Sequence, residues 1–423
     1  MVQKIIISSF VVMVLFSFTS AEAQITIVGQ NNPSVDIQAV QKAVDEGETV
    51  NLKGIFDFGD KGRVKITKGV KIVRETDPKG GPLTKINGGF WTFHSPLPAT
   101  WPPEAPGPKI TIQSIHFDGS LWVPINLAHS SGATISNNKI TNVRPFLIPQ
   151  QVLGIGSMSM QHGIYCGPQI SQMMLPPEKR AYTPDVFTGN LNISDNEIDV
   201  TNDNPIKTMA QGIFVIRTTG IKAQIYGNTI VNCSRTSIET KDNYRGKDGG
   251  GIVIVRDNKI VTSIEGIPFP TPATPIGILV GWFDDISGGL DPQRNIKYIV
   301  LNNGIRTRGK ASAGIGALTD GVVIVNNAII SEGGEAFGLG VYSSDGYIAY
   351  NRIEGVSGRP AMFVRPLKPL KGSKNVFVDN YLKQSKSSTA DVVFEKDASN
   401  NSFIGHTCKV TDLGSNNSIH MGK

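Results

Sequence analysis

The stretch SIETKDNYRG, residues 237–246, gathers more reactive side chains than any other part of the sequence. In a strand, Glu239 and Lys241 would point to the same face, because side chains alternate from one face to the other. Such a pair suits β-elimination on a uronic acid polymer, in which a base removes the proton beside a carboxylate. We therefore assign Lys241 as the candidate base and Glu239 as its partner or as a ligand of a calcium ion. A simple surface ion pair is the alternative.

The same reaction needs a cation that neutralises the carboxylate of the substrate. The candidates for this role are Arg217 and Arg365. Together with Lys241 and Glu239, they form the candidate catalytic set. No pattern in the sequence identifies the metal, so calcium remains the single candidate cofactor and is not required.

Paired carboxylates would support a different reaction, the hydrolysis of a glycosidic bond. The sequence WFDDISGG places Asp284 and Asp285 beside Trp282, and we include all three among the candidate substrate-binding residues. His162, in QHGIY, only partly matches the G-H-G segment of polygalacturonase-type hydrolases, and no R-x-K segment occurs in a suitable downstream coil. We interpret His162 as a turn or core-edge residue.

The elements that position these residues repeat along the chain. An Asn followed two residues later by an aliphatic residue recurs in short phrases such as ISDNEIDV and IYGNTIVN, at Asn138, Asn196, Asn228, Asn258, Asn303, Asn327, Asn351 and Asn380. Successive spacings are 58, 32, 30, 45, 24, 24 and 29 residues. Repeats of this length indicate a solenoid, a propeller or an array.

Each period also contains a second strand type, including GIYCG, GIFVI, SIETK and IGILVG, and no segment long enough for a helix. Periods of 24 residues are too short for a four-stranded propeller blade, so the pattern favours a parallel β-helix. Stacked coils set like residues above one another, about 4.8 Å apart. The Asn side chains would then hydrogen-bond along a column, and the left-handed turn between sheets would be tolerated by Asn.

Alternation within the second strand type directs one residue of each coil outward, and some of these are aromatic. This outward position is occupied by Phe214 and Phe363. The next outward position, two residues further along the strand, is occupied by Tyr342 in its coil, and Trp282 would lie on the same face. Exposed aromatic rings suit the C–H faces of sugars. The alternative is that the long inserted segments cover them. These four residues, with Asp284 and Asp285, form the candidate substrate-binding set.

The segment before the coils has a helical pattern, which predicts a helix that caps the first coil. In SVDIQAVQKAVDEG, Ile37, Val40 and Val44 follow helical spacing, Asp36 lies near the start and Gly47 ends the pattern. With the N-x-I coils, this cap resembles the right-handed parallel β-helix, or pectate-lyase-like, superfamily over residues 34–420. The resemblance implies an all-β solenoid with an N-terminal helical cap. It does not imply one activity, because lyases, hydrolases, surface-binding proteins and tailspikes share the fold.

The first 23 residues have the form of a cleaved signal peptide, with Lys4, an apolar run and an A-x-A site at residues 21–23. We expect a secreted or periplasmic protein whose residues 24–423 form one β-helix domain, with the cap at about 34–60. An uncleaved anchor is the alternative. No later segment predicts a membrane span. The spacing of Cys166, Cys233 and Cys408 fits no zinc pattern, and we expect buried thiols.

Lys and Arg total 41 against 35 Asp and Glu, so the net charge is +6. This excess is compatible with an acidic polymer, whereas the scattered positive residues form no stripe and predict no nucleic-acid binding. We therefore expect a monomer that binds an acidic polysaccharide. The stronger form of this expectation is that the protein also cleaves the polysaccharide by β-elimination. A non-catalytic glycan-binding or structural surface protein is the alternative, and a glycoside hydrolase is the third.

Overall fold

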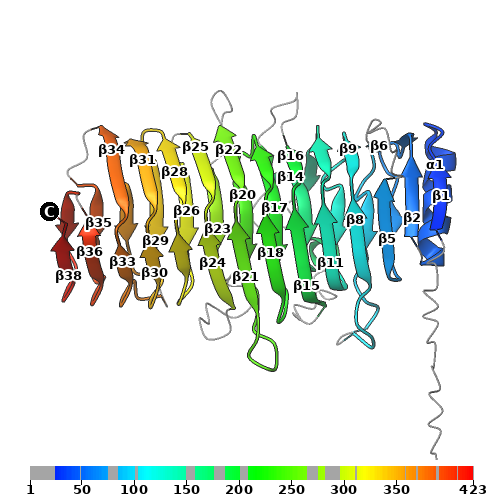
Figure 1. Ribbon diagram of the computed structural model, residues 1–423. Coiled ribbons are helices and arrows are strands. Elements are labelled where there is room, and N and C mark those ends of the chain that lie inside the picture. The colour runs from blue at the N-terminus through cyan, green and yellow to red at the C-terminus, as the bar shows by residue number, and fades with distance from the viewer. Residues whose placement is uncertain are drawn as a thin grey trace, which may run out of the picture.

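The computed structural model describes residues 24–47, 49–74, 84–100, 103–148, 158–175, 186–200, 208–263, 275–281, 296–309, 312–357, 359–367, 370–386, 390–406 and 408–422. These residues form an elongated stack of rungs (Figure 1), and each rung except those at the two ends contributes one strand to each of three sheets, named A, B and C. All neighbouring strands within the stack run parallel. The predicted right-handed parallel β-helix is confirmed.

Each sheet stacks its strands in chain order from the N-terminal end. Sheet A contains β1 (Gln24–Val28), β2 (Thr49–Lys53), β5 (Val70–Arg74), β8 (Lys109–Gln113), β11 (Ser130–Ser136), β15 (Phe187–Ser194), β18 (Lys222–Tyr226), β21 (Ile252–Arg256), β24 (Lys297–Leu301), β27 (Val323–Val325), β30 (Tyr347–Ala349), β33 (Val376–Val378), β36 (Ser402–His406) and β38 (Ser418–Met421). Sheet B contains β3 (Ile55–Asp57), β6 (Thr84–Asn87), β9 (Ile115–Asp118), β12 (Lys139–Thr141), β16 (Glu197–Asp199), β19 (Thr229–Val231), β22 (Lys259–Ser263), β25 (Gly304–Arg308), β28 (Ala328–Glu332), β31 (Arg352–Ser357) and β34 (Tyr381–Lys386). Sheet C contains β4 (Val64–Lys65), β7 (Phe93–Ser95), β10 (Ile125–Leu127), β14 (Met158–Cys166), β17 (Thr208–Ile216), β20 (Thr236–Lys241), β23 (Ile276–Val280), β26 (Ala313–Ala317), β29 (Phe337–Val341), β32 (Met362–Val364), β35 (Val392–Phe394) and β37 (Val410–Asp412), and β13 (Phe146–Ile148) joins it antiparallel to β14.

The predicted Asn column lies at the corner between sheets A and B. From Asn138 to Asn380, each side-chain amide donates to the side-chain oxygen of the next Asn at 2.8–3.0 Å. The aliphatic residue two positions later is buried in every one of these eight coils. The ladder satisfies buried polar groups at a turn that no sheet hydrogen bond reaches.

The left-handed conformation at this corner falls on the residue before the ladder Asn, and our placement of it on the Asn itself was wrong. Asn137, Asp195 and Tyr350 hold φ values of 56°, 55° and 56°, and Gly227 occupies the same place with φ 66°. The ladder Asn is thus kept for its hydrogen bonds, and the preceding residue redirects the chain.

A second, shorter Asn ladder lies at the opposite corner, where sheet C leads into sheet A, near the C-terminal end. Asn375 donates its amide to Asn401, which donates to Asn417, both at 3.0 Å. The backbone N–H of Gly346 extends it with a 2.9 Å bond to Asn375. The same solution therefore serves two corners of the helix.

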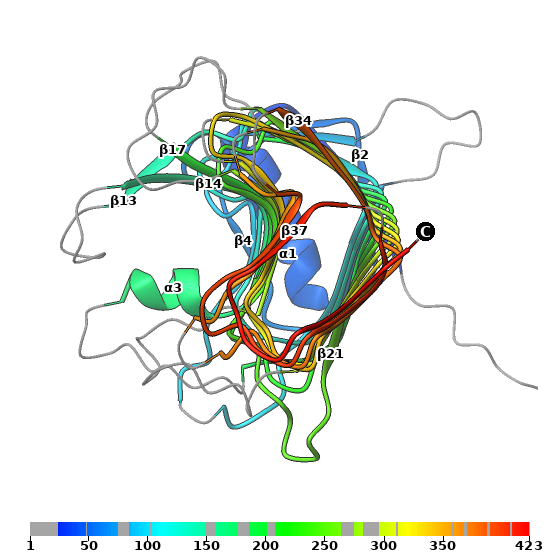
Figure 2. The same cartoon turned by 90° about the vertical axis from the view of Figure 1, so that its left-hand side faces the viewer.

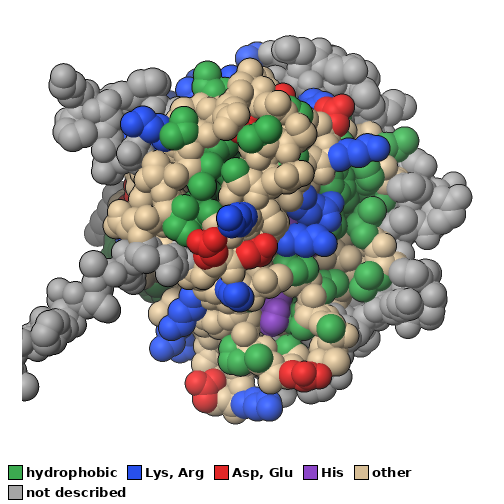
Figure 3. Space-filling model, turned by 90° about the vertical axis from the view of Figure 1, so that its right-hand side faces the viewer, with side chains coloured by type: hydrophobic (Ala, Val, Ile, Leu, Met, Phe, Trp, Pro, Cys, Tyr) green, Lys and Arg blue, Asp and Glu red, His purple; other side chains and the backbone are tan. Residues whose placement is uncertain are grey.

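The predicted helix is confirmed as α1 (Pro33–Glu46), and it covers the N-terminal end of the stack (Figures 1 and 2). Asn32 caps its start by accepting the N–H of Ser34, and Gly47 ends it with φ 77°. Asp36 is buried and accepts backbone N–H groups from residues 30, 32 and 57, which fastens the cap to the first rung. Figure 3 shows this end, where side chains of both charges are mixed with hydrophobic ones.

Glycine recurs in the sheet C strands, directly before the buried aliphatic residue, at Gly163, Gly212, Gly277, Gly314 and Gly338. A Cβ at Gly314 would lie 2.3 Å from the Ile329 side chain and 2.5 Å from the Gly338 carbonyl oxygen. The other four meet an isoleucine of sheet B and the next rung in the same way. The chain bends here so closely that a side chain would collide with the core.

The thiols of Cys166 and Cys233 are buried as expected, Cys408 is half-buried, and none forms a disulfide. Within the described ranges, no helix combines the length and apolarity that a membrane crossing requires. Residues 1–23, where we expect the signal peptide, lie outside the described residues.

Candidate functional site

The strand register of sheet C confirms the outward column that alternation predicts. Tyr165, Phe214 and Glu239 are register neighbours on β14, β17 and β20, and the column continues through Leu279, Gly316, Gly340, Phe363 and Val393. Lys241 is the register neighbour of Ile216 and lies two positions after Glu239. The candidate chemistry is therefore located on the outer face of sheet C.

Our expectation that the aromatic residues of this column are exposed is wrong for Phe214 and Phe363. Only 7% of Phe214 and 4% of Phe363 are exposed, and Tyr342 is half-buried. Phe214 belongs to a hydrophobic cluster outside the helix, together with Trp91, Trp122, Val123, Ile148, Tyr165, Ile170 and Ile216. The short helix α3 (Gln169–Met173) and strand β13 lie outside sheet C (Figure 2) and provide part of this cover.

A second hydrophobic cluster covers the sheet C face further toward the C-terminal end. It consists of Leu279, Leu318 and Leu370, with Tyr342, Ile276 and Leu367 packed against it. Between the two clusters lies β20, whose outward residues are Glu239 and Lys241. The polar residues of β20 thus lie between two apolar clusters on the outer face of sheet C.

Glu239 and Lys241 form an ion pair, with 3.1 Å between the Lys241 Nζ and the Glu239 Oε1. Glu239 is 2% exposed and Lys241 is 15% exposed. The second carboxylate oxygen accepts a hydrogen bond from the Nε2 of Gln211 on the preceding rung. The ammonium also lies 5.4 Å from the ring centroid of Phe214, within the range of a cation–π contact. The predicted pair therefore exists, but it is mostly buried rather than a surface pair.

Arg217 follows β17 and lies close to Lys241 along the backbone, since its N–H points to the Lys241 carbonyl oxygen at 3.4 Å. Its side chain is 2% exposed, and its Nε lies 3.9 Å from the Oδ2 of Asp242, which is fully buried. A neutraliser must reach the substrate, and the structure turns this guanidinium toward a buried carboxylate. Lys241 is therefore the more accessible of these two cations.

Arg365 lies on the same face as Lys241 but at a distance. Four strand spacings separate β20 from β32, which corresponds to about 19 Å. Arg365 forms a two-point ion pair with Glu395, at 2.6 and 2.7 Å, and its guanidinium lies 5.4 Å from the Phe363 ring centroid. Glu395 raises the pKa of Arg365. The structure therefore does not bring Arg365 together with Glu239 and Lys241 in one catalytic centre.

Trp282, Asp284 and Asp285 lie outside the described residues. Their candidate role in binding, and the hydrolase that the paired aspartates would support, remain predictions. Among the residues that are described, no group of three or more His, Cys, Asp or Glu side chains is arranged to hold a metal ion. A role of Glu239 as a calcium ligand also remains a prediction.

Gln211 is a member of this site that the sequence did not indicate, and it lies beside His162, which we interpreted as a turn or core-edge residue. His162 is buried, and its ring lies parallel to that of Phe214, with 5.9 Å between centroids. Burial lowers its pKa from 6.5 to about 3, opposed by a hydrogen bond with Gln211. The two residues are register neighbours on β14 and β17. The QHG of β14 and the AQG of β17 each directly precede the buried isoleucine of their coil. This equivalence in the sequence could have indicated that His162 and Gln211 are neighbours.

The neutral His162 predicts a pH dependence of stability. Below pH 6.5 the unfolded chain binds a proton at this residue while the folded chain does not, so stability falls as the pH decreases from 6.5 toward 3. We expect His162→Gln to remove about 1.6 kcal/mol of the loss between pH 6.5 and pH 5. Urea unfolding at both pH values measures it. The exposed His420, changed to Gln, is the control, and an equal loss in wild type and His162→Gln would contradict the prediction.

No protein-family model matches this chain, and no curated protein matches its sequence. Among solved structures, the chain is similar to the A-module of the mannuronan C-5 epimerase AlgE6 of Azotobacter vinelandii, at 12% identity over 91% of each chain, with a TM-score of 0.43.

Two further structures show a comparable likeness. The tailspike protein 3 of bacteriophage CBA120 has 9% identity over 92% of this chain and 53% of its own, with a TM-score of 0.48. A mannuronic acid specific polysaccharide family 6 lyase from human gut microbiota has 13% identity over 94% of this chain and 82% of its own, with a TM-score of 0.33. At these identities the likeness concerns the course of the chain and does not extend to the side chains of a site.

Proposed function

We propose that this protein is exported and binds an acidic polysaccharide across the outer face of sheet C, where Lys241 contacts a carboxylate of the polymer. The observation that carries the proposal is a partly exposed ammonium between two apolar clusters. A positive group at a break in an apolar surface offers charge recognition, and the surrounding apolar groups exclude water and strengthen it.

The contacts of Lys241 support binding more than elimination. A lysine that acts as a base must lose its proton, whereas the carboxylate of Glu239 at 3.1 Å favours the charged ammonium. Gln211 holds the other oxygen of Glu239 and fixes the carboxylate in this place. The arrangement therefore keeps Lys241 positively charged, and a charged lysine can bind an anionic sugar without cleaving it.

Two substitutions should change the affinity in opposite directions. Lys241→Met removes the charge but keeps an apolar chain over Phe214, and we expect at least a tenfold weaker affinity for a uronate polymer. Glu239→Gln removes the competing negative charge and keeps a hydrogen-bonding group beside Gln211, so we expect tighter binding. Calorimetric titration with alginate, polygalacturonate and hyaluronate measures both.

The matched control is Lys222→Met, an exposed lysine on β18 of sheet A. Thermal unfolding of each variant separates loss of binding from loss of structure. The proposal fails if no uronate polymer binds, or if Lys241→Met and Lys222→Met have equal affinities. Ultraviolet absorbance of an unsaturated product, measured with and without calcium, tests β-elimination in the same samples. Its loss in Lys241→Met would restore Lys241 as the base.

A further inference from the structure

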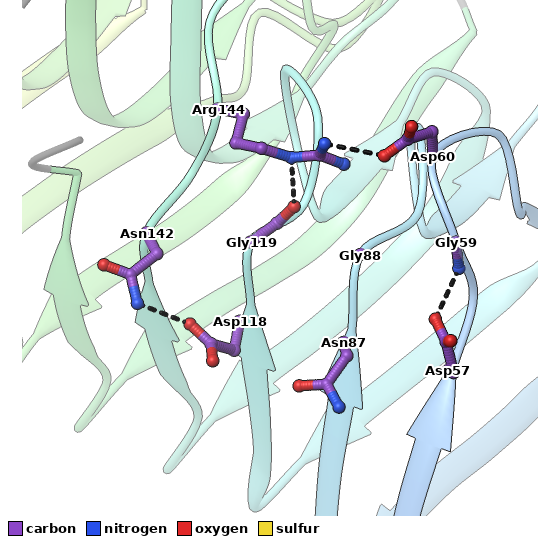
Figure 4. A pocket seen from close by; sticks show the side chains of 9 residues that line it. All are labelled: Asp57, Gly59, Asp60, Asn87, Gly88, Asp118, Gly119, Asn142 and Arg144. Atoms are coloured by element: carbon purple, nitrogen blue, oxygen red, sulfur yellow. Dashed lines mark hydrogen bonds and ion pairs between the residues drawn. The ribbon is translucent and has the colours of Figure 1, made fainter. Parts of the chain in front are cut away.

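A cleft on a different part of the surface crosses the turns from sheet B to sheet C in the first four rungs. It has a volume of about 520 Å³ and is lined by the side chains of Asp57, Asp60, Asn87, Asp118, Asn142 and Arg144 and by backbone at three glycines (Figure 4). Asp57, Asn87 and Asp118 are register neighbours at the ends of β3, β6 and β9. The cleft therefore presents one polar position per rung, at intervals of about 4.8 Å.

Hydrogen bonds between rungs hold most of these groups in place. Arg144 donates to Asp60 at 2.6 Å and to the Gly119 carbonyl oxygen at 2.7 Å. Asn142 donates to Asp118 at 2.7 Å. Burial acts to raise the pKa of Asp118, but hydrogen bonds from Lys85, Asn142 and Thr141 hold that pKa below its ordinary value. The side chains are thus fixed before any ligand arrives.

Asn87 differs from its neighbours in the cleft. Among the described residues, no hydrogen bond involves its side-chain amide, and the side chain is half-buried between the rungs of Asp57 and Asp118. An amide has both donors and an acceptor available for a ligand. Asn87 can therefore bind a ligand without breaking a hydrogen bond of the fold. For the same reason, its removal should cost little stability.

The mixture of donors and acceptors indicates which kind of ligand fits. Carboxylates accept, the guanidinium donates and amides do both, which matches sugar hydroxyls because each hydroxyl also does both. Three carboxylates against one guanidinium disfavour a polyanion. A metal ion would need acceptors alone, and the described residues contain no three-residue acidic or histidine group that could hold one.

Aromatic residues follow directly in the same turns. The sequence NGGFW leads from Asn87 to Trp91, and DGSLW leads from Asp118 to Trp122. Both tryptophans hold left-handed backbone conformations, with φ values of 52° and 72°, which cost a bulky residue on the order of 1–3 kcal/mol. Their indole nitrogens are buried and have no hydrogen-bond partner. Strain of this kind concentrates at binding sites.

We propose that this cleft binds a neutral saccharide, and that it is a second glycan site distinct from the one on sheet C. Its carboxylates and amides bind the hydroxyls, and the strained turns keep the polar positions in register along the axis of the helix. The polymer recognised here carries no carboxylate, so the two sites select different sugars.

Calorimetric titration with neutral hexasaccharides tests the proposal, using cellohexaose, mannohexaose, xylohexaose and chitohexaose as probes. We expect at least one to bind the wild type, and Asn87→Ala and Asp60→Asn each to weaken that binding at least tenfold. Asp257→Asn is the matched control, because Asp257 also forms an exposed 2.7 Å ion pair with an arginine but follows strand β21 of sheet A. Its affinity should equal that of the wild type.

Lys241→Met separates this proposal from the site on sheet C, since it should leave the binding of neutral hexasaccharides unchanged. Binding of none of the four probes would overturn the proposal. So would binding that Asn87→Ala and Asp60→Asn leave intact, because the saccharide would then lie elsewhere.

Discussion

Asn303→Ala should lower the stability of this protein by roughly 3 kcal/mol or more, because several buried polar groups lose their partners at about 1–3 kcal/mol each. The Asn303 amide donates to the carbonyl oxygens of Val255 and Leu301 and to the side chain of Asn327, all at 2.9–3.0 Å. Its oxygen accepts both the backbone and the side-chain amide of Asn258. The midpoint of urea unfolding measures the loss.

The matched control is Asn190→Ala on β15, an exposed Asn that lies outside the ladder. A surface change of this kind should stay within about 0.5 kcal/mol of the wild type. If both variants unfold at the same urea concentration, the ladder does not stabilise the corner between sheets A and B.

Gly314→Ala should also destabilise the protein, by about 1–3 kcal/mol, because one added methyl group overpacks the core. Its Cβ would lie 2.3 Å from Ile329 and 2.5 Å from the carbonyl oxygen of Gly338. Neither neighbour can retreat easily, since Ile329 is 1% exposed and the carbonyl belongs to the next rung. Thermal unfolding of the purified variant measures the effect.

Gly304→Ala gives the opposite expectation and serves as the control. Nothing lies within 4 Å of a Cβ at Gly304, and its backbone is not in the left-handed region. Replacing such a glycine should leave the protein unchanged or stabilise it by about 0.4–1 kcal/mol, because the unfolded chain loses freedom. Equal melting temperatures for the two variants would show that the bend at Gly314 has room for a side chain.

The fold could be predicted from the sequence because a solenoid repeats its constraints. Asn303 and Asn327 serve the same corner 24 residues apart, so the same hydrogen bonds demand the same residue. The outward column from Tyr165 to Val393 follows from alternation alone, and the register confirms it. Each coil thus predicts the same strands and the same corner, and agreement between the coils supports the prediction.

The burial of the outer face could not be predicted in this way. Phe214 lies in one hydrophobic cluster with Ile148 and Ile170, which belong to β13 and α3, two elements that do not repeat from coil to coil. Alternation gives the direction of a side chain but not what lies above it. The column beginning at Gly163 was visible in the sequence, yet the collision it avoids depends on Ile198, which lies on another sheet.

The candidate site was predicted in part for the same reason. Glu239 and Lys241 belong to one strand, so their pairing follows from a spacing of two residues. Arg217 and Arg365 require positions on other rungs. The spacing of rungs places Arg365 about 19 Å from Lys241, and the turn after β17 buries Arg217 against Asp242.

The most direct test of the binding site on sheet C is a crystal structure of the protein with a uronate hexasaccharide, taken from the polymer that binds in solution. The account predicts that the sugar lies across β20 and that one of its carboxylates contacts the Nζ of Lys241. A hexasaccharide bound on sheet A or sheet B, with Lys241 paired to Glu239 as before and not in contact with the sugar, would contradict it.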